Sequence, residues 1–66
     1  MHKVYLGGLP GDCDQPDLVR LLEEYQVRGY QGIETRRGGY AFIQFNQQQE
    51  AISAVSKLNG TSLNTS

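Results

Sequence analysis

The 66-residue chain contains one cysteine and one histidine, Cys13 and His2. A single cysteine excludes a disulfide within the chain, and its spacing from His2 does not match that of metal ligands. One histidine near the N-terminus provides no Ser, His and Asp set for nucleophilic catalysis, and no pair of catalytic carboxylates is evident. We therefore predict that the chain is not an enzyme, that it binds neither a metal nor a cofactor, and that Cys13 is a loop thiol.

Long apolar runs are also missing from the sequence. No stretch is apolar for long enough to span a bilayer, and no apolar segment lies between a basic start and a small-residue cleavage site. The glycine-rich residues 7–11 lack the Gly-Lys-Ser/Thr ending of a phosphate-binding loop. We expect a soluble intracellular chain, cytoplasmic or nuclear, that has no membrane partner and does not hydrolyse nucleotides.

The size of the chain limits the core that it can build. With 66 residues and a hydrophobic content of 38%, it can bury only about 60% of the surface that the unfolded form exposes. We therefore expect residues 1–66 to form one small domain of marginal stability. The formal net charge is -1, whereas strong non-specific binders of nucleic acid are usually basic.

Two aromatic segments carry most of the information. Residues 40–45 (YAFIQF) and residues 4–9 (VYLGGL) both have the composition of strands. Successive side chains on a strand point to opposite faces, so Ala41, Ile43 and Phe45 share one face. Tyr40 and Phe42 then share the other face with the polar residues. Because so short a chain cannot cover both sides of a sheet, one aromatic face is expected to point to solvent.

The remaining pattern predicts two helices and one further strand. Asp14 is expected to cap a first helix whose core stripe is Leu18, Leu21, Leu22 and Tyr25. Residues 33–36 form a short strand joined to residues 40–45 by a tight turn. Asn46 and Gln49 signal the cap of a second helix, which buries Ala51, Ala54, Val55 and Leu58 and stops at Gly60. The order is strand, helix, strand, strand, helix.

With these segments the chain resembles the RNA recognition motif family. Residues 38–45 match the family octamer, in which glycines and aromatic residues alternate, except that Gly38 replaces a basic residue. Residues 4–9 match the companion hexamer, except that Gly8 replaces an asparagine. The resemblance implies an α+β, ferredoxin-like fold. It also implies that the final strand of the four-stranded sheet is missing or truncated, because the chain ends where that strand would begin.

A shortened final strand would leave one edge of the first strand open to self-association. The short end is explained equally by a shortened chain, by an alternative end of the coding sequence or by a degenerate copy. Within the family, the opening residues and the short link between the second and third strands look similar to the first domain of the insulin-like growth factor mRNA-binding, or zipcode-binding, proteins. That similarity implies roles in mRNA localisation, translation and stability.

The predicted partner is single-stranded RNA, bound on the outward aromatic face. Tyr5 and Phe42 are expected to stack bases, and the resemblance places Tyr40 against the sugars. Lys3 and Gln44 share this face and are candidates for contacts with phosphate or base edges. Arg36 and Arg37 would add positive charge at its rim, although exposed charges often have no such role.

Two other functions fit the same sequence. The first is a protein-interaction module of the same fold, which would use a helix face or the open strand edge to bind another protein. The second is an unstable remnant without a binding role. The retained aromatic residues favour RNA binding over both, because neither alternative requires outward rings at this spacing.

Overall fold

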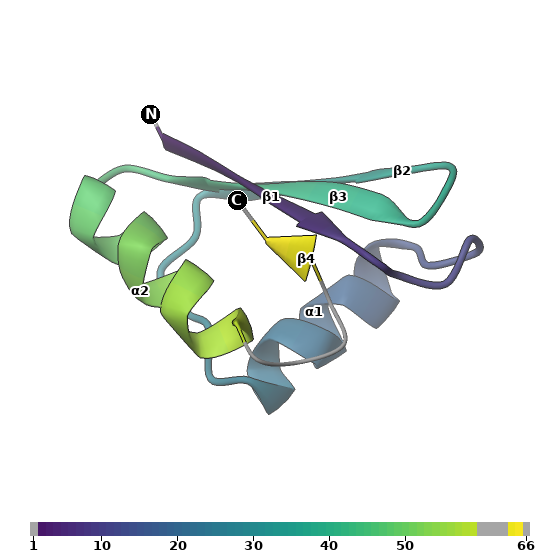
Figure 1. Cartoon of the computed structure of the whole chain (residues 1–66), viewed down its shortest axis with the longest axis horizontal. Helices are drawn as coiled ribbons and strands as arrows, with labels where there is room; N and C mark the ends of the chain where they lie inside the picture. The colour runs from purple at the N-terminus through teal and green to yellow at the C-terminus, as the bar shows by residue number, and fades with distance from the viewer. Residues whose placement is uncertain (1, 60–63, 66) are drawn as a thin grey trace.

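The computed structural model describes residues 2–59 and the backbone of residues 64 and 65. The elements, labelled in Figure 1, are β1 His2–Gly7, α1 Gln15–Glu24, β2 Gly32–Arg36, β3 Tyr40–Phe45, α2 Gln48–Leu58 and β4 Asn64–Thr65. This arrangement confirms the predicted α+β fold class and the predicted order of its first five elements.

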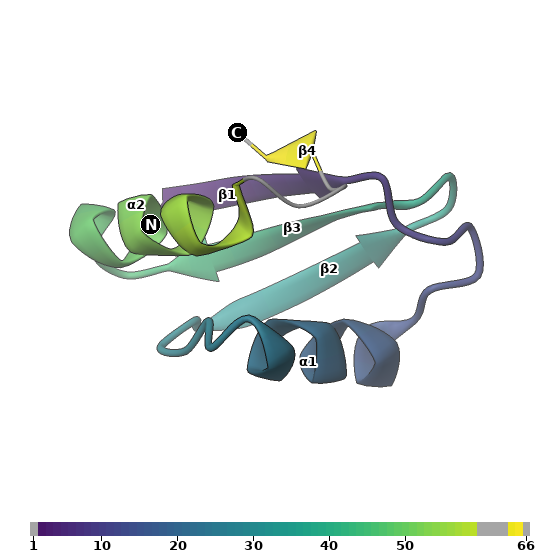
Figure 2. The same ribbon diagram turned by 60° about the horizontal axis from the view of Figure 1, so that its bottom comes forward.

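The protein has two layers, a sheet and a pair of helices (Figure 1). The strands are antiparallel and lie in the order β2-β3-β1-β4. Helix α1 packs against β2, and α2 packs against β1 and β3, so both helices cover the same face of the sheet (Figure 2). Neither helix in the described part of the chain is long and apolar enough to cross a membrane. The opposite face of the sheet is left to solvent.

Strand β3 divides the sheet into a buried and an exposed face. Ala41, Ile43 and Phe45 have 0% exposure, whereas Tyr40 and Phe42 on the alternate positions are half-buried. This result confirms the predicted alternation. The apolar core lies between the sheet and the helices and consists of Val4, Leu6, Leu9, Leu18, Leu22, Val27, Ala41, Ile43, Phe45, Ala51, Ala54 and Leu58.

The first helix begins as predicted. The Asp14 side chain accepts a hydrogen bond from the Asp17 N–H at 3.3 Å, and the Asp17 side chain accepts one from the Asp14 N–H at 3.4 Å. This reciprocal pair satisfies two amides that the helix itself leaves without partners. Leu18 and Leu22 are buried, and the partly buried Leu21 and Tyr25 pack against the core, so the helix presents the expected stripe.

The predicted cap of the second helix is wrong. The N-cap residue of α2 is Gln47, and no side chain there caps the first turn. A capping side chain bonds amides two or three residues later and so must immediately precede the helix. Asn46 lies one residue too early to do so. The buried stripe is nevertheless confirmed at Ala51, Ala54 and Leu58, with Val55 partly buried; the predicted stop at Gly60 lies outside the described residues.

The structure also corrects both ends of the sheet. Strand β1 ends at Gly7 rather than at residue 9, because Gly8 takes a left-handed φ of +77°. A final strand, β4, is present, in which Asn64 pairs with Gly7 and Thr65 pairs with Leu6. Among the described residues, the outer edge of β1 before Leu6 has no strand partner. Self-association through that edge stays a prediction.

Truncating the buried side chain of Ile43 should unfold much of the protein. Ile43→Ala removes a fully buried side chain from the central strand, at an expected cost of about 2 to 5 kcal/mol in the free energy of unfolding. Ile52→Ala is the matched control, because Ile52 is 59% exposed on α2. Thermal denaturation followed by circular dichroism measures both. Equal melting temperatures for the two variants would show that the faces of the sheet are assigned the wrong way round.

The α1 cap should make stability fall in acid. Hydrogen bonding with the Asp14 side chain and backbone, together with the Arg20 guanidinium at 2.6 Å, lowers the pKa of Asp17 below its ordinary value of 3.8. A depressed folded-state pKa stabilises the protein above pH 3.8, and this contribution disappears as the pH falls through the folded-state pKa. Asp17→Asn should therefore flatten the dependence of melting temperature on pH in that window. Parallel curves for Asp17→Asn and the parent protein would contradict the assignment.

Candidate nucleic-acid interface

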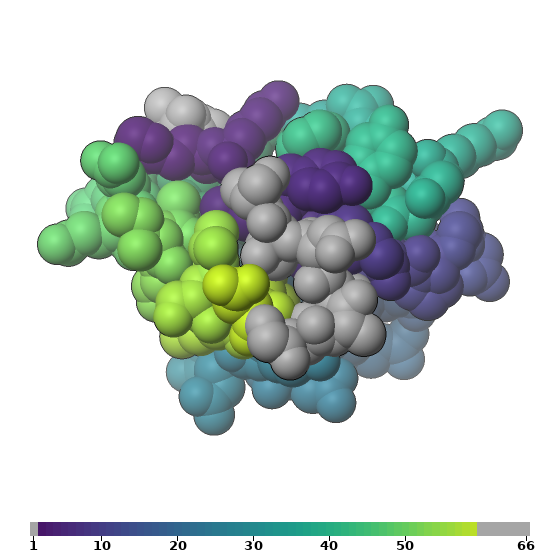
Figure 3. Space-filling view, in the orientation of Figure 1, coloured from purple at the N-terminus to yellow at the C-terminus, as the bar shows by residue number. Residues whose placement is uncertain are grey.

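The solvent face of the sheet is a small grid of side chains from three neighbouring strands. The pairing register places Glu34 of β2, Phe42 of β3 and Tyr5 of β1 in one row. Gln44 and Lys3 form the row beside it, and Arg36 and Tyr40 form the row on the other side. Strand pairing therefore brings together residues that are up to 41 positions apart in the sequence. Figure 3 shows β1 and the β2–β3 hairpin on the upper side of the molecule.

Three rings form the centre of this face, and we call Tyr5, Tyr40 and Phe42 the aromatic triad. Each pair of ring centroids is 6.0 Å apart, and the interplanar angles are 33° for Tyr5–Tyr40, 62° for Tyr5–Phe42 and 90° for Tyr40–Phe42. These separations are typical of interacting aromatic pairs. A side chain at Gly7 would collide with the Tyr5 hydroxyl, so the glycine leaves room for that ring. The triad is a half-buried apolar surface that remains accessible to a planar ligand.

Glu34 organises the polar side chains around the aromatic triad. Its Oε1 atom accepts a hydrogen bond from Gln44 Nε2 at 2.8 Å and lies 4.0 Å from Lys3 Nζ. Its Oε2 atom accepts from the Arg36 guanidinium at 2.6 Å. The three partners come from β1, β2 and β3. One carboxylate therefore connects β2, β3 and β1 on the solvent face.

Lys3 also lies over an aromatic ring. Its Nζ atom is 5.4 Å from the centroid of Phe42, within the range of a cation–π contact. The contact is weak, because the Lys3 side chain is 57% exposed. A base stacked on this face of Phe42 would have to displace the ammonium from above the ring.

Most of the residues predicted from the sequence do converge on one face. The structure places on the grid Lys3, Tyr5, Arg36, Tyr40, Phe42 and Gln44. Arg37 is different, because it lies exposed in the turn between β2 and β3. The roles of all these residues in binding stay predictions.

Sequence reasoning missed Glu34. This carboxylate pairs with two of the cations on the sheet, Lys3 and Arg36. The signal was available, since alternation along β2 places Glu34 on the same face as Arg36. The contacts of Glu34 could not be predicted from the sequence, because they depend on the register of three strands.

The turn between β2 and β3 explains a departure from the family octamer. Gly38 has φ +99° and Gly39 has φ +81°, a region that side chains with a Cβ rarely adopt. A basic residue at position 38 would be strained there. The Leu9 N–H donates to the Gly39 carbonyl at 2.9 Å, which ties the turn to the segment after β1. This bond fixes the hairpin end from which Tyr40 projects.

The surroundings of Cys13 do not favour a reactive thiol. Cys13 lies between β1 and α1, and partial burial together with Asp17, Asp14 and Asp12 raises the pKa of its thiol above the ordinary value of 9.0. A raised pKa leaves less of the reactive thiolate at neutral pH. The described residues contain no group of three or more His, Cys, Asp or Glu side chains placed to hold a metal ion.

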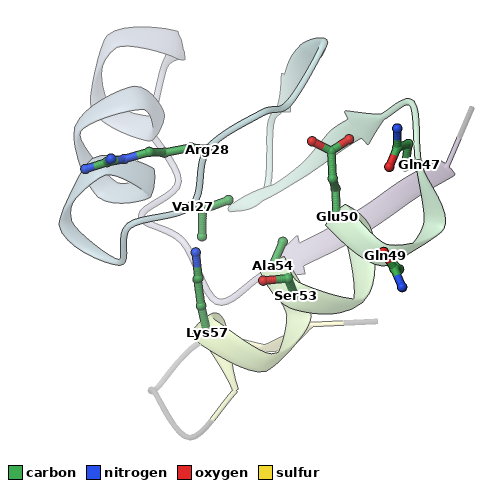
Figure 4. A pocket seen from close by; sticks show the side chains of 8 residues that line it. All are labelled: Val27, Arg28, Gln47, Gln49, Glu50, Ser53, Ala54 and Lys57. Carbon is green, nitrogen blue, oxygen red and sulfur yellow. The ribbon is translucent and has the colours of Figure 1, made fainter.

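A second concave surface lies on the helical side (Figure 4). This groove, of about 210 Å³, lies between α2 and the segment after α1 and is lined by Val27, Arg28, Gln47, Gln49, Glu50, Ser53, Ala54 and Lys57. Lys57 Nζ donates to the Gln26 carbonyl at 2.7 Å across one end. The groove is open, is lined by both apolar and polar side chains, and lies on the helical side of the sheet, away from the aromatic triad.

Comparison with known proteins agrees with this geometry. The model of the RNA recognition motif family matches residues 4–66. The chain is 34% identical over 60 residues to a probable splicing factor, arginine/serine-rich 3, of Caenorhabditis elegans, covering 89% of this chain and 23% of that protein. It is 36% identical over 61 residues to serine-arginine protein 55 of Drosophila melanogaster, covering 92% of this chain and 15% of that protein.

Solved structures agree as well. The Rna15 RNA recognition motif with bound GU RNA superimposes with a TM-score of 0.76 at 30% identity, covering 97% of this chain and 79% of that one. A second structure of the Rna15 motif gives a TM-score of 0.77 at 29% identity, covering 97% of this chain and 85% of that one. These matches confirm the predicted fold and the predicted class of function, an RNA-binding module.

The turn that positions Tyr40 should not tolerate a side chain. In Gly39→Ala, the new Cβ would lie 2.2 Å from the Leu9 carbonyl oxygen at a left-handed φ. We expect a loss of about 1 to 3 kcal/mol in the free energy of unfolding. Gly11→Ala is the control, because nothing lies within 4 Å of its added methyl group. Chemical denaturation compares the two, and equal midpoints would argue against the close approach.

Proposed function

Since the chain belongs to the RNA recognition motif family, we propose that it binds single-stranded RNA by stacking bases on Tyr5 and Phe42. The observation that carries this proposal is the aromatic triad on the solvent face of the sheet, where the core does not need it. Rings left to water are available to planar ligands. Each stacked base contributes about 1 to 3 kcal/mol, as judged from alanine substitution in other proteins.

The arrangement of the triad supports two adjacent stacking positions. Tyr5 and Phe42 lie opposite each other on β1 and β3, with their centroids 6.0 Å apart. Tyr40 borders both rings and is placed to pack against the sugars that connect two stacked bases. The Rna15 structure with bound GU RNA supports the same class of ligand.

The charged residues at the face supply limited electrostatic attraction. Lys3 and Arg36 are each paired with Glu34, whereas Arg37 is exposed in the adjoining turn. Binding of phosphate by Lys3 or Arg36 therefore replaces an internal ion pair. We expect modest affinity for a single module, which further linked modules would increase by raising the effective concentration.

A role in mRNA regulation is the wider proposal. Relatives described as splicing factors support it. The similarity to zipcode-binding proteins, inferred from residues 1–9, the short β2–β3 link and residues 50–55, is part of the same proposal. The chain spans a third or less of two curated relatives, both probable splicing factors of Caenorhabditis elegans. The activity of a whole relative therefore does not transfer directly to this chain. We propose an intracellular, non-enzymatic module whose residues 1–66 form one domain.

A protein-interaction module is the second candidate. Two observations favour it: the outer edge of β1 before Leu6 has no strand partner among the described residues, and a groove lies beside α2. Extended peptides bind open strand edges through main-chain hydrogen bonds. This function would leave the aromatic triad unused, and so we rank it second.

Removing the Phe42 ring should weaken RNA binding without unfolding the protein. We expect Phe42→Ala to lose about 1 to 3 kcal/mol of binding free energy for short single-stranded RNA, because one stacking platform is gone. Phe42→Tyr keeps the ring and should bind like the parent. Isothermal titration gives the affinities, and circular dichroism confirms that the variants are folded. Unchanged affinity of folded Phe42→Ala would refute the RNA-binding face.

A further inference from the structure

Glu34 is an unexpected group on a surface that binds a polyanion. Its side chain is 35% exposed, and it lies directly opposite Phe42 in the pairing of β2 with β3. Directly opposed side chains have Cβ atoms about 5 Å apart, so the carboxylate borders any base that stacks on Phe42. A role in contacting phosphate is excluded by charge, because two negative charges repel.

The neighbours of Glu34 fix the carboxylate in place and determine what it presents. Gln44 and Arg36 donate to its two oxygens at 2.8 and 2.6 Å, and the Lys3 ammonium lies 4.0 Å from one of them. An ionised carboxylate accepts hydrogen bonds and donates none. Arginine and lysine donate and accept none. Beside Phe42 the face therefore presents acceptors next to donors, in an order fixed by strand pairing.

We propose that Glu34 selects guanine as the base stacked on Phe42. Guanine is the RNA base whose Watson–Crick edge offers two adjacent N–H donors, N1–H and the N2 amino group, next to an acceptor, O6. The Glu34 carboxylate matches the two donors, and the guanidinium of Arg36 or the ammonium of Lys3 matches O6. Reading of this edge on splayed, stacked bases is the usual route to sequence specificity in single-stranded RNA.

The other bases fit this arrangement less well. Adenine and cytosine each place a ring-nitrogen acceptor beside their single amino donor, so a lone pair faces a carboxylate oxygen. Uracil has one N–H donor between two carbonyl acceptors. For each of these bases, one carboxylate oxygen either gains no donor from the base or faces an acceptor of the base. A site built to hydrogen-bond two donors discriminates against ligands that lack them.

This inference rests on the proposed function, and the test separates the two. Pentanucleotides of uridine with guanine, adenine, cytosine or uracil at the centre are titrated into the parent protein and into Glu34→Gln. The parent should bind the guanine oligonucleotide about tenfold more tightly than the uracil one, the discrimination typical of a bidentate base contact. In Glu34→Gln the guanine preference should shrink to less than about threefold, because an amide supplies one acceptor where the carboxylate supplies two.

Three controls make the result specific. Glu24→Gln makes the same change of charge at the end of α1, away from the sheet, and should keep the parent preference. Inosine, which lacks the N2 amino group, should bind the parent more weakly than guanosine does, and Glu34→Gln should lose much of that difference. Amide spectra of each variant verify that it is folded.

Each remaining outcome overturns the inference. The inference is wrong if the parent protein does not prefer the guanine oligonucleotide. It is also wrong if Glu34→Gln keeps the guanine preference of the parent. An equal rise in affinity for all four oligonucleotides would show that Glu34 only repels phosphate. If Phe42→Ala weakens RNA binding but the parent protein and Glu34→Gln have the same base preference, only the inference about guanine fails and the proposed function stands. If Phe42→Ala binds like the parent, or the parent binds none of the oligonucleotides, the proposed function fails with it.

Discussion

The antiparallel pairing of β1 with β3 is the constraint on which the other features depend. It places Val4 opposite Ile43 in the core and, on alternate positions, Tyr5 opposite Phe42 at the surface. A shift of this pairing by one residue would expose the core side chains and bury the rings. The same register therefore determines both the stability of the protein and the surface that it offers to a ligand. Both helices lie on one side of it, which is why the other side stays open.

On the solvent face, one carboxylate offsets part of the positive charge of Lys3 and Arg36. The aromatic triad supplies area, whereas Glu34 holds Lys3, Arg36 and Gln44 in defined positions around it. Such a face recruits RNA weakly by attraction alone, in agreement with the formal net charge of -1 for the chain. Recognition then depends on shape and on hydrogen bonding at base edges, as is usual for unpaired RNA.

The sequence predicted the two faces of β3 because side chains along a strand alternate with a period of two. In the structure, Ile43 on the predicted inner face has 0% exposure. It also predicted the start of α1, where Asp14 and Asp17 carry a local signal. Asn46 carried a similar signal and failed, because the turn out of β3 needed one more residue before α2. Local chemistry identifies a candidate cap, but the chain path selects the residue that caps.

The pairing of β4 and the contacts of Glu34 could not be predicted for a different reason. Two polar residues, Asn64 and Thr65, show no alternation that marks a strand, so their pairing with β1 depends on the assembled sheet. Glu34 was visible as a strand residue, but its partners lie on other strands and depend on register and rotamer together. A site assembled across several strands is hardest to predict from the sequence when each strand contributes only one residue.

The ion pairs of Glu34 also affect how binding responds to ionic strength. A single strand that docks on free lysines and arginines releases condensed counterions, and its affinity falls steeply with salt, with a slope of about -0.7 per neutralised phosphate. Lys3 and Arg36 share the single carboxylate of Glu34, so their two positive charges are already partly neutralised within the protein. Added salt weakens these internal pairs together with the contacts to RNA, so the two effects partly cancel. A single strand on this face would therefore bind with a shallower salt dependence than its number of cations implies.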